Sequence, residues 1–356
     1  MKTSIGGQAL LEGIMMRGPK KSSMAVRNPD GEIIVEEIEI KEKKRAKITK
    51  LPFIRGVFSF ASSMAIGYKA LMRSAEISGI EEAEAEIERE KAAKKRAKAA
   101  KKAEKSGAAP ENIEEISVTE EKAESVSNDE TKNDSSAFSG AIMVISTLLG
   151  VLLAVGLFIL LPNFACTLIL GENPDPVWYA VISGAIKVVI LILYMWLVSF
   201  MKDIKRTFMY HGAEHKTIFC YEKGLELTVD NVKKQSRFHP RCGTSFLFLT
   251  VFVSIALMIV VGVLLRVWLP LEIIESKLLY TLIRTGIAIL LVPLMAGAGY
   301  ELIKLAGKYD NVFTRIISAP GILMQRITTK EPDDSMIECA IAAIKEVIPE
   351  DGSDRI

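Results

Sequence analysis

Histidine, tryptophan and cysteine are scarce in this chain. Its 356 residues include three histidines, three tryptophans and four cysteines. The cysteines are scattered without an even spacing, which argues against a disulfide framework and predicts mostly reduced thiols. No apolar segment followed by a cleavage site is found near the N-terminus, so we expect no cleaved signal peptide. The formal net charge is only +2, and no nucleic-acid partner is predicted.

Long hydrophobic segments, in contrast, are abundant in this chain. It is 49% hydrophobic and 25% charged, so the two kinds of residue must be segregated. Four segments stay apolar for about the ~20 residues that cross a bilayer. They are residues 141–161, 177–200, 246–265 and 282–302. A buried helical core is the alternative, but core helices seldom stay apolar on every face for so long. The predicted fold is an α-helical polytopic membrane protein with about four transmembrane helices in a lipid bilayer.

Lysine and arginine predict the orientation of these spans. Residues 162–176 carry neither, whereas nine lie in residues 201–245. More follow the fourth span, and basic loops stay in the cytoplasm. We therefore expect a multi-pass protein of the cell membrane with both termini and residues 201–245 cytoplasmic. Arg266 and Lys277, between the third and fourth spans, are a weak conflict.

Outside the spans, the sequence predicts small elements. Residues 22–40 form a β-hairpin around Asn28-Pro29-Asp30-Gly31, a strong turn sequence. Residues 51–75 are expected to form a helix lying in the membrane interface or packed on the bundle. A re-entrant hairpin broken at glycines is the alternative. Residues 333–348 resemble a capped terminal helix.

The chain therefore divides into four predicted parts. Residues 1–80 are an N-terminal cytoplasmic and interfacial segment with a glycine-rich motif and the hairpin. Residues 81–138 are a charged helix and a disordered linker. Residues 139–308 are the four-span domain with a cytoplasmic histidine-rich loop at 201–245. Residues 309–356 form C-terminal cytoplasmic helices, the first of them amphipathic.

All three histidines lie in the loop between the second and third spans. His211-Gly212-Ala213-Glu214-His215 has the form H-x-x-E-H. On a helix the two histidines share one face, and their nitrogens can reach one ion. Glu214 lies near that face, where a carboxylate can hold a water and accept its proton, as in the inverzincin metallopeptidases. Glu214 is therefore the candidate catalytic residue.

A second pair of potential ligands follows. His239 and Cys242 are three residues apart, with Pro240 favouring an extended backbone and Gly243 permitting a sharp turn. His211, His215, His239 and Cys242 are thus the candidate ligands of a divalent metal, with zinc the first choice. Four bound ligands would close the site and make it structural, whereas three would leave a position open for catalysis. An unmetallated polar network is the alternative.

Four charged residues are further candidates for the site. Glu301 lies at the cytoplasmic end of the fourth span. Glu12 sits in a glycine-rich apolar stretch, where a carboxylate needs a partner, and Arg17 is the expected one. Arg241 or Arg17 would stabilise an anionic transition state or hold a lipid or phosphate group.

Four motifs carry a resemblance to a known family. They are GGQALLEGIMMRGP at 6–19, YHGAEHKTIFCYE at 210–222, FHPRCGTSFL at 238–247 and AGAGYE at 296–301. These stretches resemble the YqhQ-like family, a domain-of-unknown-function family of mostly bacterial multi-pass membrane proteins. The resemblance covers most of the chain except residues 81–136. It implies a metal-dependent enzyme, a label based on the same histidines, and it brings no role for the first motif.

Two functions of different classes follow. The leading hypothesis is a membrane-embedded metal-dependent hydrolase with its site at the cytoplasmic face. The alternative is a non-enzymatic accessory or regulatory protein that binds another membrane protein complex, with any metal only structural. A metal transporter ranks lowest, because the candidate ligands lie outside the spans.

Overall fold

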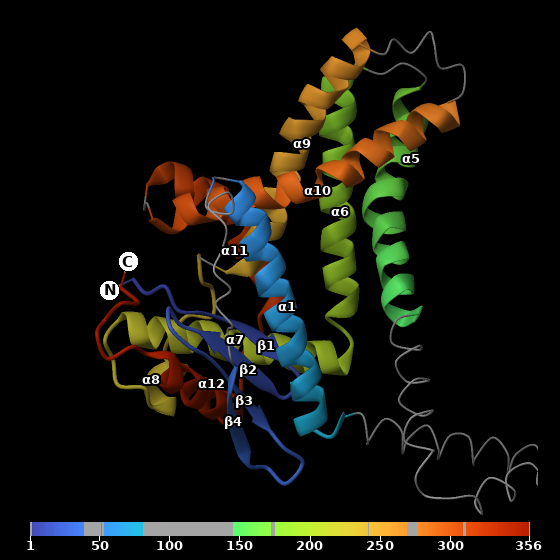
Figure 1. Ribbon diagram of the computed structural model, residues 1–356. Helices are drawn as coiled ribbons and strands as arrows, with labels where there is room; N and C mark the ends of the chain where they lie inside the picture. The colour runs from blue at the N-terminus through green and yellow to red at the C-terminus, as the bar shows by residue number, and fades with distance from the viewer. Residues whose placement is uncertain are drawn as a thin grey trace, which may run out of the picture. The chain divides into compact units, whose positions relative to one another are not determined.

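The computed structural model describes residues 2–38, 51, 53–80, 145–171, 175–240, 242–268, 277–308 and 311–355 (Figure 1). The chain splits into one compact unit of Met1–Gly79 and Leu157–Ile356 and a second of Ile80–Gly156. The predicted charged helix and disordered linker lie outside the described residues. So do the last two residues of the predicted hairpin.

The N-terminal region is a four-stranded antiparallel sheet in which neighbours in the sequence are neighbours in space. Its strands are β1 (Gly6–Leu10), β2 (Gly13–Arg17), β3 (Ser22–Arg27) and β4 (Ile33–Ile38). The predicted hairpin is confirmed as β3 and β4, with Gly31 in its turn at a φ of 88°. The hairpin of β1 and β2, formed by the glycine-rich motif, was missed.

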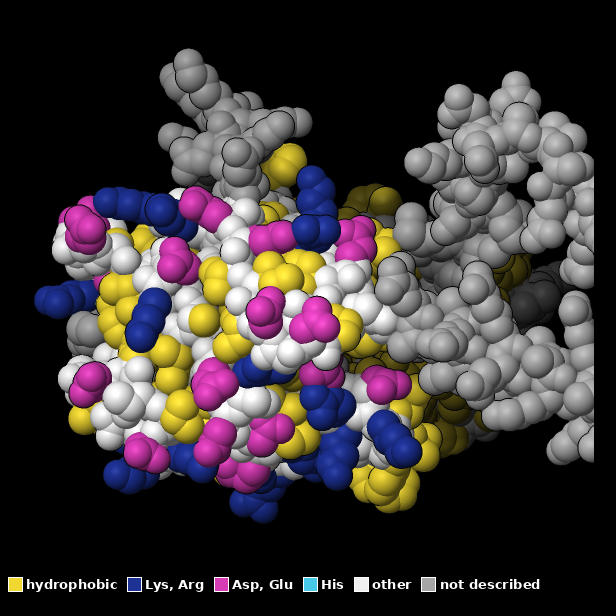
Figure 2. Space-filling view, turned by 90° about the horizontal axis from the view of Figure 1, so that it is seen from below, with side chains coloured by type: hydrophobic (Ala, Val, Ile, Leu, Met, Phe, Trp, Pro, Cys, Tyr) yellow, Lys and Arg dark blue, Asp and Glu magenta, His cyan; other side chains and the backbone are white. Residues whose placement is uncertain are grey.

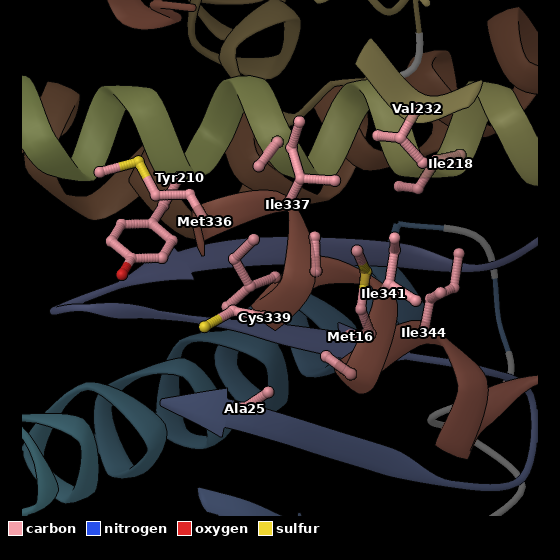
Figure 3. Close-up of a cluster of buried hydrophobic side chains, with 14 of the residues drawn as sticks. Met16, Ala25, Tyr210, Ile218, Val232, Met336, Ile337, Cys339, Ile341 and Ile344 are labelled. Carbon is pink, nitrogen blue, oxygen red and sulfur yellow. The ribbon is translucent and has the colours of Figure 1, made fainter. Parts of the chain in front are cut away.

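The main core lies between this sheet and two helices, α7 (Lys202–Glu222) and α12 (Asp334–Val347). Figure 3 shows side chains of α12, among them Ile337 and Ile344, between the strands and α7. A fully buried Ile or Met side chain contributes about 1.5–3 kcal/mol. The predicted cap of α12 is confirmed, because the Asp333 carboxylate accepts from the N–H of Met336 at 3.0 Å.

Helix α1 (Ile54–Ile77) covers the other face of the sheet, where Leu10, Met15 and Met24 pack around Ala70. Its N-terminal half packs on α10 (Lys277–Lys308). A Cβ on Gly56 would lie 2.7 Å from the carbonyl oxygen of Gly297, so the two backbones need glycine to meet. The predicted packing on the bundle is confirmed. The re-entrant alternative is wrong, because α1 is a continuous helix through Gly56 and Gly67.

Three described helices are long and apolar enough to cross a membrane: Ile145–Leu170, Pro176–Val198 and Leu282–Leu302. The third predicted span falls in α9 (Gly243–Trp268), whose described apolar stretch, Leu249–Leu265, is shorter than the other three. These helices support a helical membrane protein with a small N-terminal sheet and at least three candidate spans.

The first span ends later than the sequence suggested. A loop was expected at residues 162–176, but the helix continues through a π-helical turn (Gly156–Leu160) into α5 (Leu161–Leu170). Pro162 stands in the first turn of α5, where the lack of an N–H costs little. The wider π-helical turn before Pro162 accommodates the backbone hydrogen bond that proline does not donate. The helix therefore ends only at Gly171, whose φ is 76°.

A basic residue is accommodated among the spans by an aromatic ring. The Arg284 guanidinium carbon lies 3.6 Å from the centre of the Tyr179 ring. Both side chains line a cavity of about 10 Å³ together with Lys187 of α6 (Pro176–Val198). Tyr179 in turn donates to the backbone oxygen of Asn163 at 3.1 Å. The charge is therefore held inside the bundle and away from lipid.

Charged side chains cover the end of the molecule seen in Figure 2. Lys and Arg are intermixed there with Asp and Glu, and no histidine is visible on this face. Exposed ion pairs, such as that of Lys233 with Asp334, are also found among the described residues. A mixed charged surface is typical of protein in water, in contrast to the apolar spans.

Candidate metal centre

The histidine-rich segment between the second and third predicted spans is largely helical, as the predicted shared face of His211 and His215 requires. Helix α7 runs from Lys202 to Glu222, followed by the short helix α8 (Val229–Lys233) and an irregular stretch before α9. Tyr210, Ala213 and Ile218 place an apolar stripe of α7 in the main core. This amphipathic pattern is hidden in the sequence by the polar residues between them.

Three side chains converge where α7 meets the start of α9. The ligand atoms of His211, His215 and Cys242 all lie within 4.8 Å of one another. His211 Nε2 is 3.1 Å from Cys242 Sγ, and the two histidine rings have centroids 4.4 Å apart. His215 is 1% exposed and Cys242 is 7% exposed. The helical spacing of four residues thus puts both rings on the face that the sequence predicted.

Backbone carbonyls fix the orientation of both rings. His211 Nδ1 lies 2.9 Å from the carbonyl oxygen of Thr328, and His215 Nδ1 lies 2.5 Å from that of Arg237. A carbonyl only accepts, so each Nδ1 carries a proton and each Nε2 keeps its lone pair. Burial also lowers the pKa of His215, against the opposing contact with Cys242. Burial outweighs the Cys242 and Arg237 contacts, which raise this pKa, and favours the neutral ring of His215, the form that binds metals.

His239 borders this group without joining it. Its Nε2 lies 3.5 Å from a carboxylate oxygen of Glu222, and its ring centre is 5.6 Å from that of His215. Its backbone exchanges two hydrogen bonds with the side-chain amide of Gln325, at 2.7 and 2.8 Å. Of the four predicted ligands, the structure therefore brings three together and directs the fourth to a carboxylate.

Glu214 lines a cavity of about 270 Å³ between β1, α7 and the start of α9. His211, Cys242 and residues of β1 also line it. The carboxylate accepts the backbone N–H of Gly7. Burial raises the pKa of Glu214, and its electrostatic interaction with neighbouring His211 and the Gly7 hydrogen bond oppose that rise. A buried carboxylate therefore stands at the wall of a cavity shared with two of the three clustered side chains.

Gly7 is a site residue to which sequence reasoning gave no role. A Cβ at this position would lie 2.8 Å from the backbone oxygen of Met15 and 2.9 Å from the Glu214 carboxyl carbon. Only glycine lets β1 approach Glu214 so closely. The two glycines at the start of β1 were the signal in the sequence for a close approach. The contact of Gly7 with α7, however, depends on the tertiary fold.

Glu12 is paired, but not with the partner that was expected. Arg206 donates two hydrogen bonds to its carboxylate, both at 2.5 Å, and Tyr210 adds a third at 3.2 Å. Arg17 instead donates to the Ser63 hydroxyl at 3.2 Å. The expected pair of Glu12 and Arg17 is therefore wrong, since the turn between β1 and β2 directs Glu12 toward α7.

Glu301 and Arg241 complete the predicted set. Arg55 of α1 binds the Glu301 carboxylate through two nitrogens, at 2.6 and 2.5 Å. Neither Glu301 nor Glu12 belongs to the three-residue cluster found among the described side chains. Arg241 lies outside the described residues. Glu301 therefore links α1 to the fourth predicted span.

Comparison with known proteins places the chain in a family. A family model described as "Protein of unknown function (DUF1385)" matches residues 51–350. The chain belongs to this family. It is also 29% identical over 350 residues to "Uncharacterized protein YqhQ" of Bacillus subtilis (strain 168), covering 96% of this chain and 92% of that protein. No solved structure matches. The resemblance to YqhQ-like proteins is confirmed, and the DUF1385 family brings no activity with it.

The close approach of β1 to α7 gives a paired test. Gly7→Ala should lower the free energy of unfolding by about 1–3 kcal/mol, because the new methyl group overpacks against Met15 and Glu214. Gly6→Ala is the control and should change it by less than about 0.5 kcal/mol, since nothing lies within 4 Å of a Cβ there. Unfolding can be followed by alkylation of buried Cys339, whose pKa is raised to about 11 by burial. Equal effects of both substitutions would contradict the predicted contact.

Proposed function

We propose that this protein is a membrane-embedded, metal-dependent hydrolase with its centre at the cytoplasmic face of the cell membrane. One observation carries the metal site: two histidines donate Nδ1–H to backbone carbonyls while each Nε2 is left for a shared ion beside a thiol. Ligating histidines almost always have such a second partner, which fixes the ring and its tautomer. The donors present therefore fit a metal.

Zinc is the ion that suits these donors. Two imidazoles and one thiolate match its preference for nitrogen and sulfur ligands. Three protein ligands are typical of catalytic zinc, whereas structural sites have four. With His239 beside Glu222, His211, His215 and Cys242 would hold the ion as three protein ligands. The three-ligand set therefore favours the hydrolase over a purely structural metal.

Each residue of the site would have a separate role in the proposed hydrolysis. Bound zinc would polarise a carbonyl or phosphoryl oxygen of the substrate. Glu214 would take a proton from the attacking water, because its carboxylate lines the cavity and the Gly7 N–H holds it there. The Thr328 and Arg237 carbonyls would keep the two rings aligned. The walls formed by β1 and α9 would exclude bulk water.

Metal analysis tests the ligand set. Protein purified gently, without chelator, should contain about one zinc ion per chain. His211→Ala, His215→Ala and Cys242→Ala should each lower this content at least tenfold, since each removes a direct ligand. His239→Ala is the matched control and should retain most of the zinc. Wild-type protein that carries no metal, measured by mass spectrometry, would refute the metal site.

Glu214→Gln separates catalysis from structure. The substitution keeps the shape of the side chain and removes the base, so zinc content should stay constant. Hydrolysis of a small ester such as p-nitrophenyl acetate should fall about 100- to 10,000-fold. Glu226→Gln, at an exposed carboxylate, is the control and should leave the rate unchanged. An unaltered rate in Glu214→Gln would favour a structural metal.

The proposed orientation is open to thiol labelling in intact cells. All four native cysteines are buried, so an introduced cysteine reports its own side of the membrane. Val177→Cys, exposed at the start of α6, should react with a maleimide that cannot cross membranes. Lys345→Cys, exposed on α12, should react only after the cells are opened. Labelling of Lys345→Cys alone in intact cells would reverse the topology.

A further inference from the structure

The outer edge of β1 has backbone groups that face away from the sheet. The Gly18 N–H donates to the carbonyl of Lys21 at 2.8 Å and closes the turn between β2 and β3. Along an antiparallel ladder, successive residues bond alternately to either side. Met15 of β2 therefore bonds toward β1, where it is paired with Gln8. The backbone N–H and carbonyl groups of Gly7 and Ala9 therefore point away from β2, toward the open edge of the sheet.

This outward edge runs along the cavity of the proposed site. Both Gly7 and Ala9 line it, together with Glu214 and Cys242. The Gly7 N–H is used by the Glu214 carboxylate, which confirms the direction deduced from the register. Among the described residues, no hydrogen bond is found to the N–H or carbonyl of Ala9. Ala9 thus presents a donor and an acceptor about 7 Å along the strand from Gly7.

We infer that the substrate is an extended polypeptide segment that pairs with the edge of β1 through Ala9. This inference rests on the proposed hydrolase and names its substrate class. Pairing with an exposed strand edge is a general way to bind an unfolded chain, since backbone bonds supply the affinity. The segment would lie along β1, with the carbonyl of the bond to be cleaved opposite Gly7 and beside Glu214.

The cavity is suited to a peptide rather than a lipid phosphate. None of its described lining residues is Lys or Arg, which would neutralise a phosphate. The nearby Arg206 is already held by Glu12. A volume of about 270 Å³ is just below the about 300–1,000 Å³ of common ligand pockets, enough for a short stretch of chain. Neutral backbone groups at Gly7 and Ala9 match a neutral amide.

The chemical step is hydrolysis of a peptide bond. The oxygen of water bonds to the carbonyl carbon, and one proton of that water passes to Glu214. As the C–N bond breaks, Glu214 returns the proton to the leaving nitrogen. The products are a carboxylic acid and an amine, and no oxidant or further reactant is required.

Ala9→Pro tests the pairing directly. It removes the outward N–H but no ladder bond, and proline is tolerated at such edge positions. Fluorescein-labelled casein, an unfolded polypeptide, serves as the probe with zinc-loaded full-length protein. Cleavage should fall at least tenfold in Ala9→Pro, whereas zinc content stays within twofold of that of the wild type. Val35→Pro, in β4 at the opposite edge of the sheet, is the control. Val35 is exposed and its backbone N–H points away from β3, so this variant should cleave casein at the wild-type rate.

Binding is measured separately, so that the two proposals can fail separately. Glu214→Gln with zinc should bind casein in fluorescence anisotropy, and adding Ala9→Pro should weaken this at least tenfold. Hydrogen exchange at the Ala9 amide of Glu214→Gln should slow when casein is added, a result that needs no proline variant. Ester hydrolysis with no casein binding would overturn the peptide inference alone. Binding at Ala9 with no hydrolysis of any kind would overturn the hydrolase and leave the peptide site.

Discussion

The burial of α7 is the constraint on which the candidate site depends. Its second half lies between the sheet, α12 and the segment after α11 (Val312–Thr328). Gly212 packs against the Lys330 carbonyl, and the Lys330 N–H donates to the carbonyl of Phe208 at 2.9 Å. A helix held from several sides has little freedom to rotate, so His211 and His215 keep a fixed direction toward Cys242. Precise placement of this kind is what a metal site requires.

Charged side chains of α7 are paired with residues from distant parts of the chain. Lys216 is 6% exposed, and its ammonium group contacts Glu331 at 2.7 Å and the Lys233 carbonyl at 2.9 Å. Glu12 neutralises Arg206 near the N-terminal half of the same helix. An unpaired charge would be costly at buried Lys216, so its partners help to determine how α7 is seated. They also explain why so polar a helix can be buried.

Local patterns predicted the local elements, and tertiary contacts decided the rest. The turn at Asn28–Gly31, the cap at Asp333 and the helical spacing of His211 and His215 all depend on neighbours in the sequence, and all three were anticipated. The hairpin of β1 and β2 was missed because β2 is buried on both faces and lacks alternation, and β1 begins with two glycines. Glycine spacing alone does not show that Gly7 meets Glu214.

The partners of charged residues were the least predictable part. Arg17 is nearer to Glu12 in the sequence than Arg206 is, yet Glu12, in the turn before β2, binds α7, whereas Arg17, at the end of β2, donates to α1. Likewise, His239 and Cys242 are three residues apart, but only Cys242 joins His211 and His215. The backbone of His239 is bound to Gln325 of α11, a contact across 86 residues that no spacing rule contains.

The two ends of the chain are joined, and this bears on how the protein is made. The Thr3 hydroxyl donates to the Asp354 carboxylate at 2.6 Å, and Thr3 pairs with Arg355 in an isolated bridge. The N-terminal strands are made before α12, which covers their apolar face. Throughout synthesis and membrane insertion, the side chains of Ile14, Met16 and Ala25 lack their final cover. The sheet and the second half of α7 therefore gain a shared packing partner only after residues 334–347 have been made.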